Sequence, residues 1–149
     1  MNAANTFPAE PGLAPGPHLK FHHLGLAARR PDEARAFLAA LGCRMGEEVF
    51  DPSQNVHLQL CTHPTHPAVE IIWPGETKGP IEKLTERHAS GIIYHVCYET
   101  DNLPAALARF AEARLRVVCI SSPTPAPLFG GRKVSFYNVM GMGLIEILE

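Results

Sequence analysis

The sequence predicts an α+β fold built from two tandem β-α-β-β-β modules. Two observations predict it. First, a histidine-bearing apolar segment, a helical pattern, two further strand patterns and an apolar strand with one central glutamate follow one another, and this order occurs twice. Second, the two copies have similar spacing: His23 and His95 lie 72 positions apart, and Glu70 and Glu146 lie 76 apart. Similar offsets over four features indicate an internal duplication whose loops differ in length.

The composition is that of a single globular domain. The chain has 149 residues, of which 46% are apolar and 19% are charged. Its formal net charge of −2 gives no electrostatic reason to expect nucleic acid or a membrane surface as a partner. No apolar run approaches the roughly 20 residues that span a bilayer. No secretory signal is visible, and the four scattered cysteines favour reduced thiols. We therefore expect a cytoplasmic protein.

The first module is expected at about residues 19–75, after an N-terminal arm. Residues 1–18 are rich in Pro, Ala and Gly, lack periodicity and are predicted to be disordered. A strand is expected from Phe21 to about Ala28. Pro31-Asp32 then opens a helix that ends at Gly42. The buried face of this helix is predicted from an i, i+3, i+4, i+7 apolar stripe, formed by Ala34, Phe37, Leu38 and Leu41.

Three strands complete the first module. One is expected near residues 44–50, followed by a turn at 51–54. The next strand alternates Val56, Leu58 and Leu60 with more polar neighbours, so it is predicted to be half exposed. A hairpin loop at 63–67 leads to the first glutamate strand, at about 68–73.

The second module, at about residues 92–149, follows a connector at 76–91 that contains a helix from Pro80 to His88. A strand at 92–100 is followed by Asp101-Asn102, which are good helix N-caps. A helical stripe, a strand near 115–120 and a Pro-rich loop at 121–127 come next. The last two strands are expected around Val134 and Phe136 and at residues 144–148.

The two glutamate strands indicate a metal site. An unpaired carboxylate inside an apolar strand is costly, so Glu70 and Glu146 each need a cation or hydrogen-bonding partners. If His23 and His95 converge with them, two imidazoles and two carboxylates can bind one divalent ion of Co, Mn, Ni, Fe or Zn. His22 is the alternative to His23 as a metal ligand. Strand geometry sends the two to opposite faces, and the repeat pairs His23 with His95, so His23 is preferred.

Four further residues are candidates for binding a substrate. His57 and Gln59 face the same side of one strand, where they either line a pocket or face water. Arg132 and Lys133 follow two glycines in a turn and either grip an anionic group or form a solvated hairpin.

Five segments carry a family resemblance, namely 23–27, 70–74, 79–84, 95–99 and 143–148. They resemble the vicinal oxygen chelate superfamily, which includes glyoxalase I, extradiol dioxygenases, bleomycin-resistance proteins and, as the most similar branch, the methylmalonyl-CoA epimerases. The resemblance covers about Phe21 to Glu149 and assigns residues 19–149 to one such domain. It implies a cupped mixed sheet around a metal held by His23, Glu70, His95 and Glu146, and a homodimer.

The resemblance also implies a reaction. A metal-dependent epimerase would remove the α-proton of a 2-substituted malonyl thioester and stabilise the chelated enolate that forms. Glu146 is the first candidate for the base and Glu70 the second. The carrier of the acyl group is either coenzyme A or a carrier protein. The alternatives are a glyoxalase-I-like isomerase or lyase and a non-catalytic binding or resistance protein. The chain departs from the epimerases at Tyr94, where they usually carry a histidine.

Overall fold

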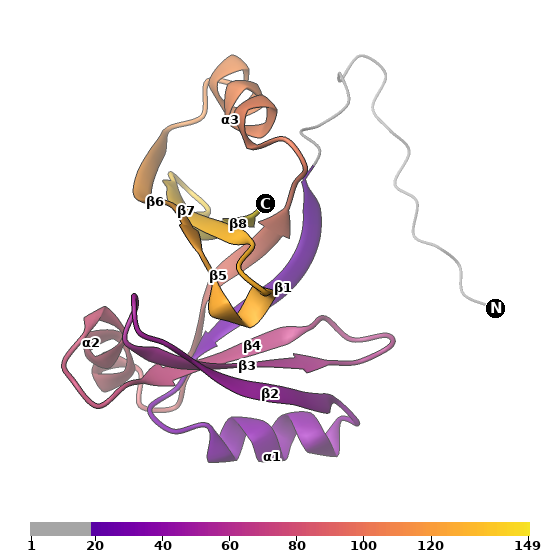
Figure 1. Ribbon diagram of the computed structural model, residues 1–149, viewed down its shortest axis with the longest axis vertical. Helices are drawn as coiled ribbons and strands as arrows, with labels where there is room; N and C mark the ends of the chain where they lie inside the picture. Colours follow the sequence, from indigo (N-terminus) through magenta and orange to yellow (C-terminus); the bar gives the residue numbers. More distant parts are fainter. Residues whose placement is uncertain (1–18) are drawn as a thin grey trace.

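The computed structural model describes residues 19–149, so the predicted arm at 1–18 lies outside the described residues. Its elements follow the order β-α-β-β-β twice, with one helix between the two copies (Figure 1). They are β1 (Lys20–Ala27), α1 (Asp32–Ala40), β2 (Arg44–Asp51), β3 (Val56–Thr62), β4 (Val69–Pro74), α2 (Pro80–Arg87), β5 (Ile92–Glu99), α3 (Leu103–Glu112), β6 (Val117–Pro125), the 3-10 helix η1 (Pro127–Phe129), β7 (Lys133–Val139) and β8 (Gly143–Leu148).

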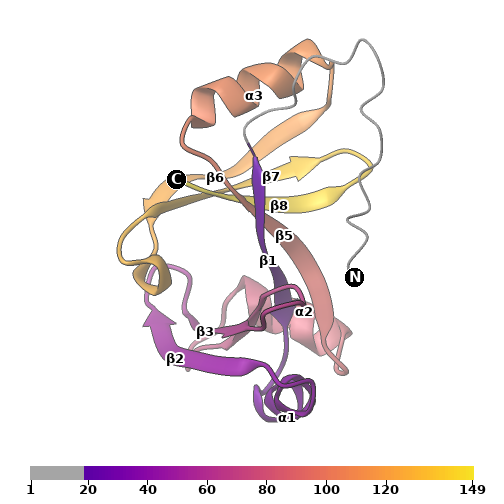
Figure 2. The ribbon, with the colours of Figure 1, turned by 90° about the vertical axis from the view of Figure 1, so that its right-hand side faces the viewer.

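All eight strands form one mixed sheet in the order β2-β3-β4-β1-β5-β8-β7-β6. The two modules meet where β1 and β5 pair antiparallel. On either side, each of these strands pairs parallel with the last strand of its own module, β1 with β4 and β5 with β8. The sheet is strongly curved, with β1 and β5 running between a β2–β4 half and a β6–β8 half (Figure 2). The predicted α+β fold of two modules in a cupped mixed sheet is confirmed.

Each module packs one helix against the outer face of its half of the sheet (Figure 1). The cluster under α1 consists of Ala28, Leu38, Cys61, Ile71 and Trp73, and the cluster under α3 of Leu103, Tyr137, Ile145 and Ile147. The inner face carries two further clusters, Ala27, Val56, Leu58, Ile72 and Ile81 in the first half and Cys97, Ala126, Val134 and Leu148 in the second. No helix within residues 19–149 is long and apolar enough to cross a bilayer.

The predicted buried face of α1 is partly wrong. Leu38 is buried, but the Phe37 side chain is 64% exposed, and Leu41 lies beyond the end of the helix and is also exposed. The reason is Arg35, whose guanidinium lies over the Trp73 ring at 5.0 Å from its centroid. This contact turns α1 so that Arg35, rather than Phe37, faces the sheet. An arginine can cover apolar surface in this way because its stem and planar head group pack well.

The half-exposed strand predicted at 56–61 has both faces covered. Val56 and Leu58 are buried on the inner face, and Gln59 and Cys61 are buried on the outer face under α1. Gln59 tolerates burial because its amide is paired at both ends. It accepts a hydrogen bond from Arg35 Nε at 2.6 Å and donates one to the Gly46 carbonyl at 2.7 Å.

The Pro-rich loop predicted at 121–127 is wrong over most of its length, because β6 continues to Pro125. β6 is the edge strand of the sheet, and its pairing with β7 shifts register on both sides of Ser121. Prolines are tolerated on an edge strand because the missing N–H faces solvent there. The proline signal therefore marked an irregular edge strand rather than a loop.

Candidate metal centre

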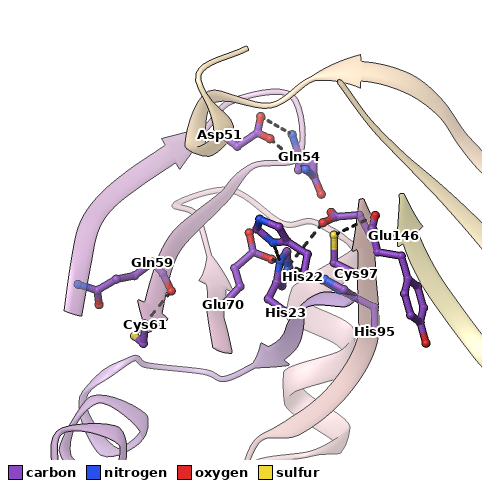
Figure 3. Close-up of polar contacts among 11 residues, drawn as sticks. His22, His23, Asp51, Gln54, Gln59, Cys61, Glu70, His95, Cys97 and Glu146 are labelled. Atoms are coloured by element: carbon purple, nitrogen blue, oxygen red, sulfur yellow. Dashed lines mark hydrogen bonds and ion pairs between the residues drawn. The ribbon is translucent and has the colours of Figure 1, made fainter. Parts of the chain in front are cut away.

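Four side chains from both modules meet at the centre of the cup (Figure 3). His23 Nε2 lies 3.1 Å from Glu70 Oε2 and 3.5 Å from both His95 Nε2 and Glu146 Oε1. His95 Nε2 lies 3.6 Å from Glu70 Oε2. One atom from each of the four residues can be chosen so that all lie within 4.8 Å of one another, and all four side chains are buried. The convergence expected from the sequence is therefore present.

Strand register explains the convergence. Cys97 of β5 pairs with His23 of β1 on one side and with Glu146 of β8 on the other. In the same way, Gly25 of β1 pairs with both Glu70 and His95. Directly paired residues point to the same face of a sheet. Two adjacent rows across four central strands therefore place all four side chains on the inner face.

Gly25 has a steric role in this arrangement. A Cβ atom at this position would collide with the imidazole ring of His95. Glycine inside a strand weakens the strand and often marks a close approach of another group. Gly25 is therefore required for the His95 ring to lie flat across β1 and reach His23.

Burial sets the charge state of the four groups in the absence of any cation. Burial, with a smaller contribution from Asp51, raises the pKa of Glu70 to about 8. Burial and the neighbouring Glu70 raise the pKa of Glu146 to about 7. Burial also lowers the pKa of His23, and burial together with His23 lowers that of His95 to about 3. The histidines are thus neutral, as metal ligands must be, while both carboxyl groups lack a positive partner.

These residues fit a divalent metal ion. Glu146 Oε1 and His95 Nδ1 are buried without a hydrogen-bond partner among the described residues. Buried polar atoms are normally satisfied, so an unsatisfied carboxylate oxygen 3.5 Å from the neutral imidazole of His23 indicates a missing positive charge. Two nitrogens and two carboxylates suit Mn, Fe, Co, Ni or Zn. The residues that would hold the ion are His23, Glu70, His95 and Glu146.

His22 lies beside His23 rather than on the opposite face, which corrects the prediction from strand periodicity. Phe21 pairs with Tyr98 and His23 with Cys97, so His22 is an extra residue in a β-bulge of β1. Its Nδ1 lies 2.8 Å from Nδ1 of His23, a hydrogen bond that leaves the other nitrogen of His23 directed at the carboxylates. Phe129 of η1 stacks on His23 and closes this side.

A cavity of about 420 Å³ adjoins the four-residue group. Tyr94 and Phe136 line it, and their rings pack on His95 with centroids 4.6 Å and 5.6 Å away. Its wall is mostly apolar, with Asp51, Ser53 and Gln54 on one side and the β6 residues Ser121 and Thr124 on the other. A concave apolar cavity with a few polar groups beside a reactive centre is the usual form of a small-molecule site.

The structure does not bring His57 and Gln59 to this cavity. They pair with Trp73 and Ile71 of β4, which lie on the outer face of the sheet, whereas Glu70 lies on the inner face. Gln59 points away from the cluster in Figure 3. His57 stacks on Trp73 with ring centroids 5.4 Å apart. Side chains alternate between the two faces of a strand, and His57 and Gln59 lie on the face opposite to Glu70. The substrate-binding role expected for them therefore has no support in this placement.

Arg132 and Lys133 also lie away from the cavity. Arg132 Nε donates to the Glu149 carbonyl at 3.0 Å, and its Nη2 lies 3.4 Å from Glu99 Oε2. Lys133 is exposed at the start of β7. These two cations occupy the solvated hairpin that was the alternative to an anion-binding turn.

Sequence reasoning missed three polar residues that line the cavity: Asp51, Gln54 and Tyr94. Asp51 is fully buried and accepts hydrogen bonds from Ser53 and from the Gln54 side chain, which holds the turn above the cluster (Figure 3). Burial and the carboxyl groups of Glu70 and Glu146 raise the pKa of Tyr94 well above its usual value. The signals for Tyr94 were its position beside His95 and its departure from the epimerases, which usually carry a histidine there.

The fold and the site define a class of protein. Residues 22–136 match the family model of the glyoxalase/bleomycin resistance protein/dioxygenase superfamily, and the chain belongs to that superfamily. This result confirms the family resemblance seen in the sequence.

Several of the similar proteins are epimerases. The chain is 29% identical over 105 residues to the ethylmalonyl-CoA/methylmalonyl-CoA epimerase of Cereibacter sphaeroides, covering 70% of this chain and 78% of that one. It is 28% identical over 112 residues to the mitochondrial methylmalonyl-CoA epimerase of Bos taurus, covering 74% of this chain but only 63% of the bovine protein. Methylmalonyl-CoA epimerase from Mycobacterium tuberculosis has the same fold, with a TM-score of 0.73, 20% identity and coverage of 92% and 91%.

Proposed function

We propose that this protein is a metal-dependent epimerase of a 2-substituted malonyl thioester such as methylmalonyl-CoA. The observation that carries the proposal is the buried group of two neutral imidazoles and two carboxylates beside the cavity. The epimerase activity of the similar proteins from Cereibacter sphaeroides and Bos taurus supports it.

The ligand residues in this proposal are His23, Glu70, His95 and Glu146. A bound divalent ion would polarise the carbonyl oxygens of the acyl group and so acidify its α-proton. Side chains of the protein carry out the remaining steps of the reaction. Apolar residues of the cavity, including Val56 and Ile81, exclude water from the acyl group.

Glu146 is the proposed base. Its carboxyl group lies at the centre of the cup and has one oxygen without a hydrogen-bond partner among the described residues. Because burial makes this carboxylate more basic than one in water, it is suited to take a proton from carbon. The centre inverts when a second proton donor protonates the opposite face of the planar acyl group, after which Glu146 releases the proton that it took. Glu70 is the second candidate for the base.

The test measures metal and chemistry separately. We expect purified protein to contain close to one divalent metal per chain by inductively coupled plasma mass spectrometry. We also expect it to exchange the α-proton of methylmalonyl-CoA in D₂O, followed by NMR. Glu146→Gln should abolish the exchange. The matched control is Glu112→Gln, which makes the same change on exposed α3 and should behave as wild type.

Each failure has its own meaning. Metal without exchange would refute the epimerase proposal for free coenzyme A thioesters, and acyl carrier protein thioesters and glyoxalase-type hemithioacetals would be tested next. Absence of metal after reconstitution with Co, Mn, Ni, Fe and Zn would refute metal dependence itself and favour a non-catalytic binding protein.

A further inference from the structure

Tyr94 is turned into the cup by a second β-bulge. In the β1–β5 pairing, Gly25 lies opposite His95 and Leu26 lies opposite Ile93, so Tyr94 is an extra residue of β5. In a regular strand its side chain would point away from that of His95. Instead its ring packs edge-to-face on His95 with centroids 4.6 Å apart, and it lines the cavity. Bulges beside active sites commonly redirect a side chain in this way.

The bulge of Tyr94 is the counterpart of the bulge of His22. The two residues lie at equivalent positions of the duplicated modules, each directly before a candidate metal-binding histidine. Their surroundings differ. The His22 ring is used within the protein, since it bonds His23 and packs against Phe129. Tyr94 instead lines the cavity, so the two equivalent rings have different surroundings.

The Tyr94 hydroxyl has no hydrogen-bond partner among residues 19–149. Its neighbours in the inner cluster are apolar, including Leu58, Ile72 and Ile81. The hydroxyl is not among the fully buried unpaired polar atoms of the described residues, so it is reachable from the cavity that the tyrosine lines. An acceptor on a molecule bound in this cavity can therefore pair with it.

The Tyr94 ring also connects the cavity with the candidate metal centre. It lines the cavity and packs on His95, and Phe136, which pairs with Glu146 of β8, lines the same cavity. An acyl group that occupies the cavity therefore lies beside both Tyr94 and the centre. An acceptor that gains negative charge as the α-proton leaves is the best partner for such a donor.

We propose that the Tyr94 hydroxyl donates a hydrogen bond to an oxygen of the acyl group in the cavity, and that it is a catalytic residue of the reaction. This inference rests on the proposed function, because the acceptor is an oxygen of the malonyl thioester. The hydroxyl remains protonated throughout and acts as a neutral donor.

The first test compares Tyr94→Phe with wild type. The substitution removes one oxygen and leaves the ring on His95. The matched control is Tyr98→Phe on the same strand, whose ring packs against Phe21. For Tyr94→Phe we expect kcat for epimerisation to fall about 100-fold, the usual effect of losing one donor to a developing oxyanion. KM should change by less than about threefold. Metal content and melting temperature should stay as in wild type, and Tyr98→Phe should keep full activity.

The second test is independent of turnover. The nitronate form of 2-nitropropionyl-CoA is a planar anion that imitates the deprotonated acyl group. Its Kd for the metal-loaded protein, measured by calorimetry, should rise about 10- to 100-fold in Tyr94→Phe, in line with loss of a hydrogen bond to a charged group. If wild type fails to exchange protons yet binds the anion in a Tyr94-dependent way, the epimerase proposal and the catalytic role of Tyr94 are both wrong, and only the hydrogen bond from Tyr94 to the bound acyl group stands. If wild type is active and Tyr94→Phe matches it in both kcat and Kd, the Tyr94 inference is overturned and the epimerase proposal stands.

Discussion

At the scale of single residues, the centre is two carboxyl groups and two histidines that burial forces into neutral forms. In the unfolded chain the glutamates have ordinary acidic pKa values. In the folded, metal-free protein the pKa of Glu146 is about 7 and that of Glu70 about 8. A carboxyl group with a raised folded-state pKa stabilises the fold while it is protonated, and this stability is lost as the pH rises through the folded pKa.

The metal-free protein should therefore lose stability between pH 6.5 and 9. Over this range His23 and His95 are mostly neutral in the unfolded state and neutral in the folded state, because burial lowers their pKa values. Of the four groups of the centre, only the two glutamates change. Burial also raises the pKa values of the Cys61 and Cys97 thiols, so these thiols add to the loss of stability near pH 9. Urea unfolding of chelator-treated protein should show the free energy of unfolding falling as pH rises, and Glu146→Gln should fall less. A flat profile in wild type would contradict the assigned burial of these carboxyl groups.

Gly25 should be intolerant of any side chain. Gly25→Ala places a methyl group where the His95 ring lies, so the ring must move away from His23. We expect metal binding to be lost and stability to fall by about 1–3 kcal/mol, as for other overpacked sites. Metal content and chemical denaturation measure the two effects. Gly79→Ala is the control, because its Cβ meets Asn55 at an ordinary 3.7 Å, and it should keep the metal. Full metal occupancy in Gly25→Ala would refute the steric role.

At the scale of elements, α3 depends on a cap that the sequence predicted. Asn102 Oδ1 accepts a hydrogen bond from the Ala105 backbone N–H at 3.0 Å. Asn102→Ala should cost about 1 kcal/mol of stability in urea, the usual effect of losing an N-cap. Asp101→Ala, one position earlier, should change stability by less than about 0.5 kcal/mol. Equal effects of the two variants would show that the cap hydrogen bond contributes nothing.

The 3-10 helix η1 joins the two modules across the mouth of the cup. It lies beside β2 of the first module, which Figure 2 shows at the left of the molecule. Leu128 packs on the inner cluster of the first module, and Phe129 stacks on His23. β6 extends to Pro125 and η1 begins two residues later, so the length of β6 determines where η1 lies. The contacts of η1 with the first module therefore depend on the length of β6.

At the scale of the whole molecule, each module supplies one histidine and one glutamate, so metal binding and folding should be coupled. Calorimetry of the metal-loaded protein should give one cooperative transition, because β1 and β5 pair along their whole lengths. Removing the metal with a chelator should lower the melting temperature by about 5–10 °C, because an ion whose concentration is well above its Kd stabilises the folded state. Two separate transitions, or a melting temperature indifferent to the chelator, would contradict this coupling. The homodimer and the cytoplasmic location stay predictions.

The sequence by itself determined the helices and strands and the four residues that form the candidate metal centre. Helical and strand periodicities are local, and they placed all eight strands, with errors at β6 and in the face of α1. The duplication then identified His23, Glu70, His95 and Glu146 by position, since equivalent residues of the two modules occupy equivalent places in the sheet.

Only the tertiary structure decided which side chains surround that centre. The bulges at His22 and Tyr94 arise from the register of β1 against β5, strands far apart in the sequence, and one extra residue reverses the face that periodicity assigns. The outward placement of Gln59 depends in the same way on α1 covering the outer face. The two-residue period of a strand predicts only that neighbouring side chains face opposite sides. Which of these sides lines the cavity is decided when the two modules pair and the sheet curves.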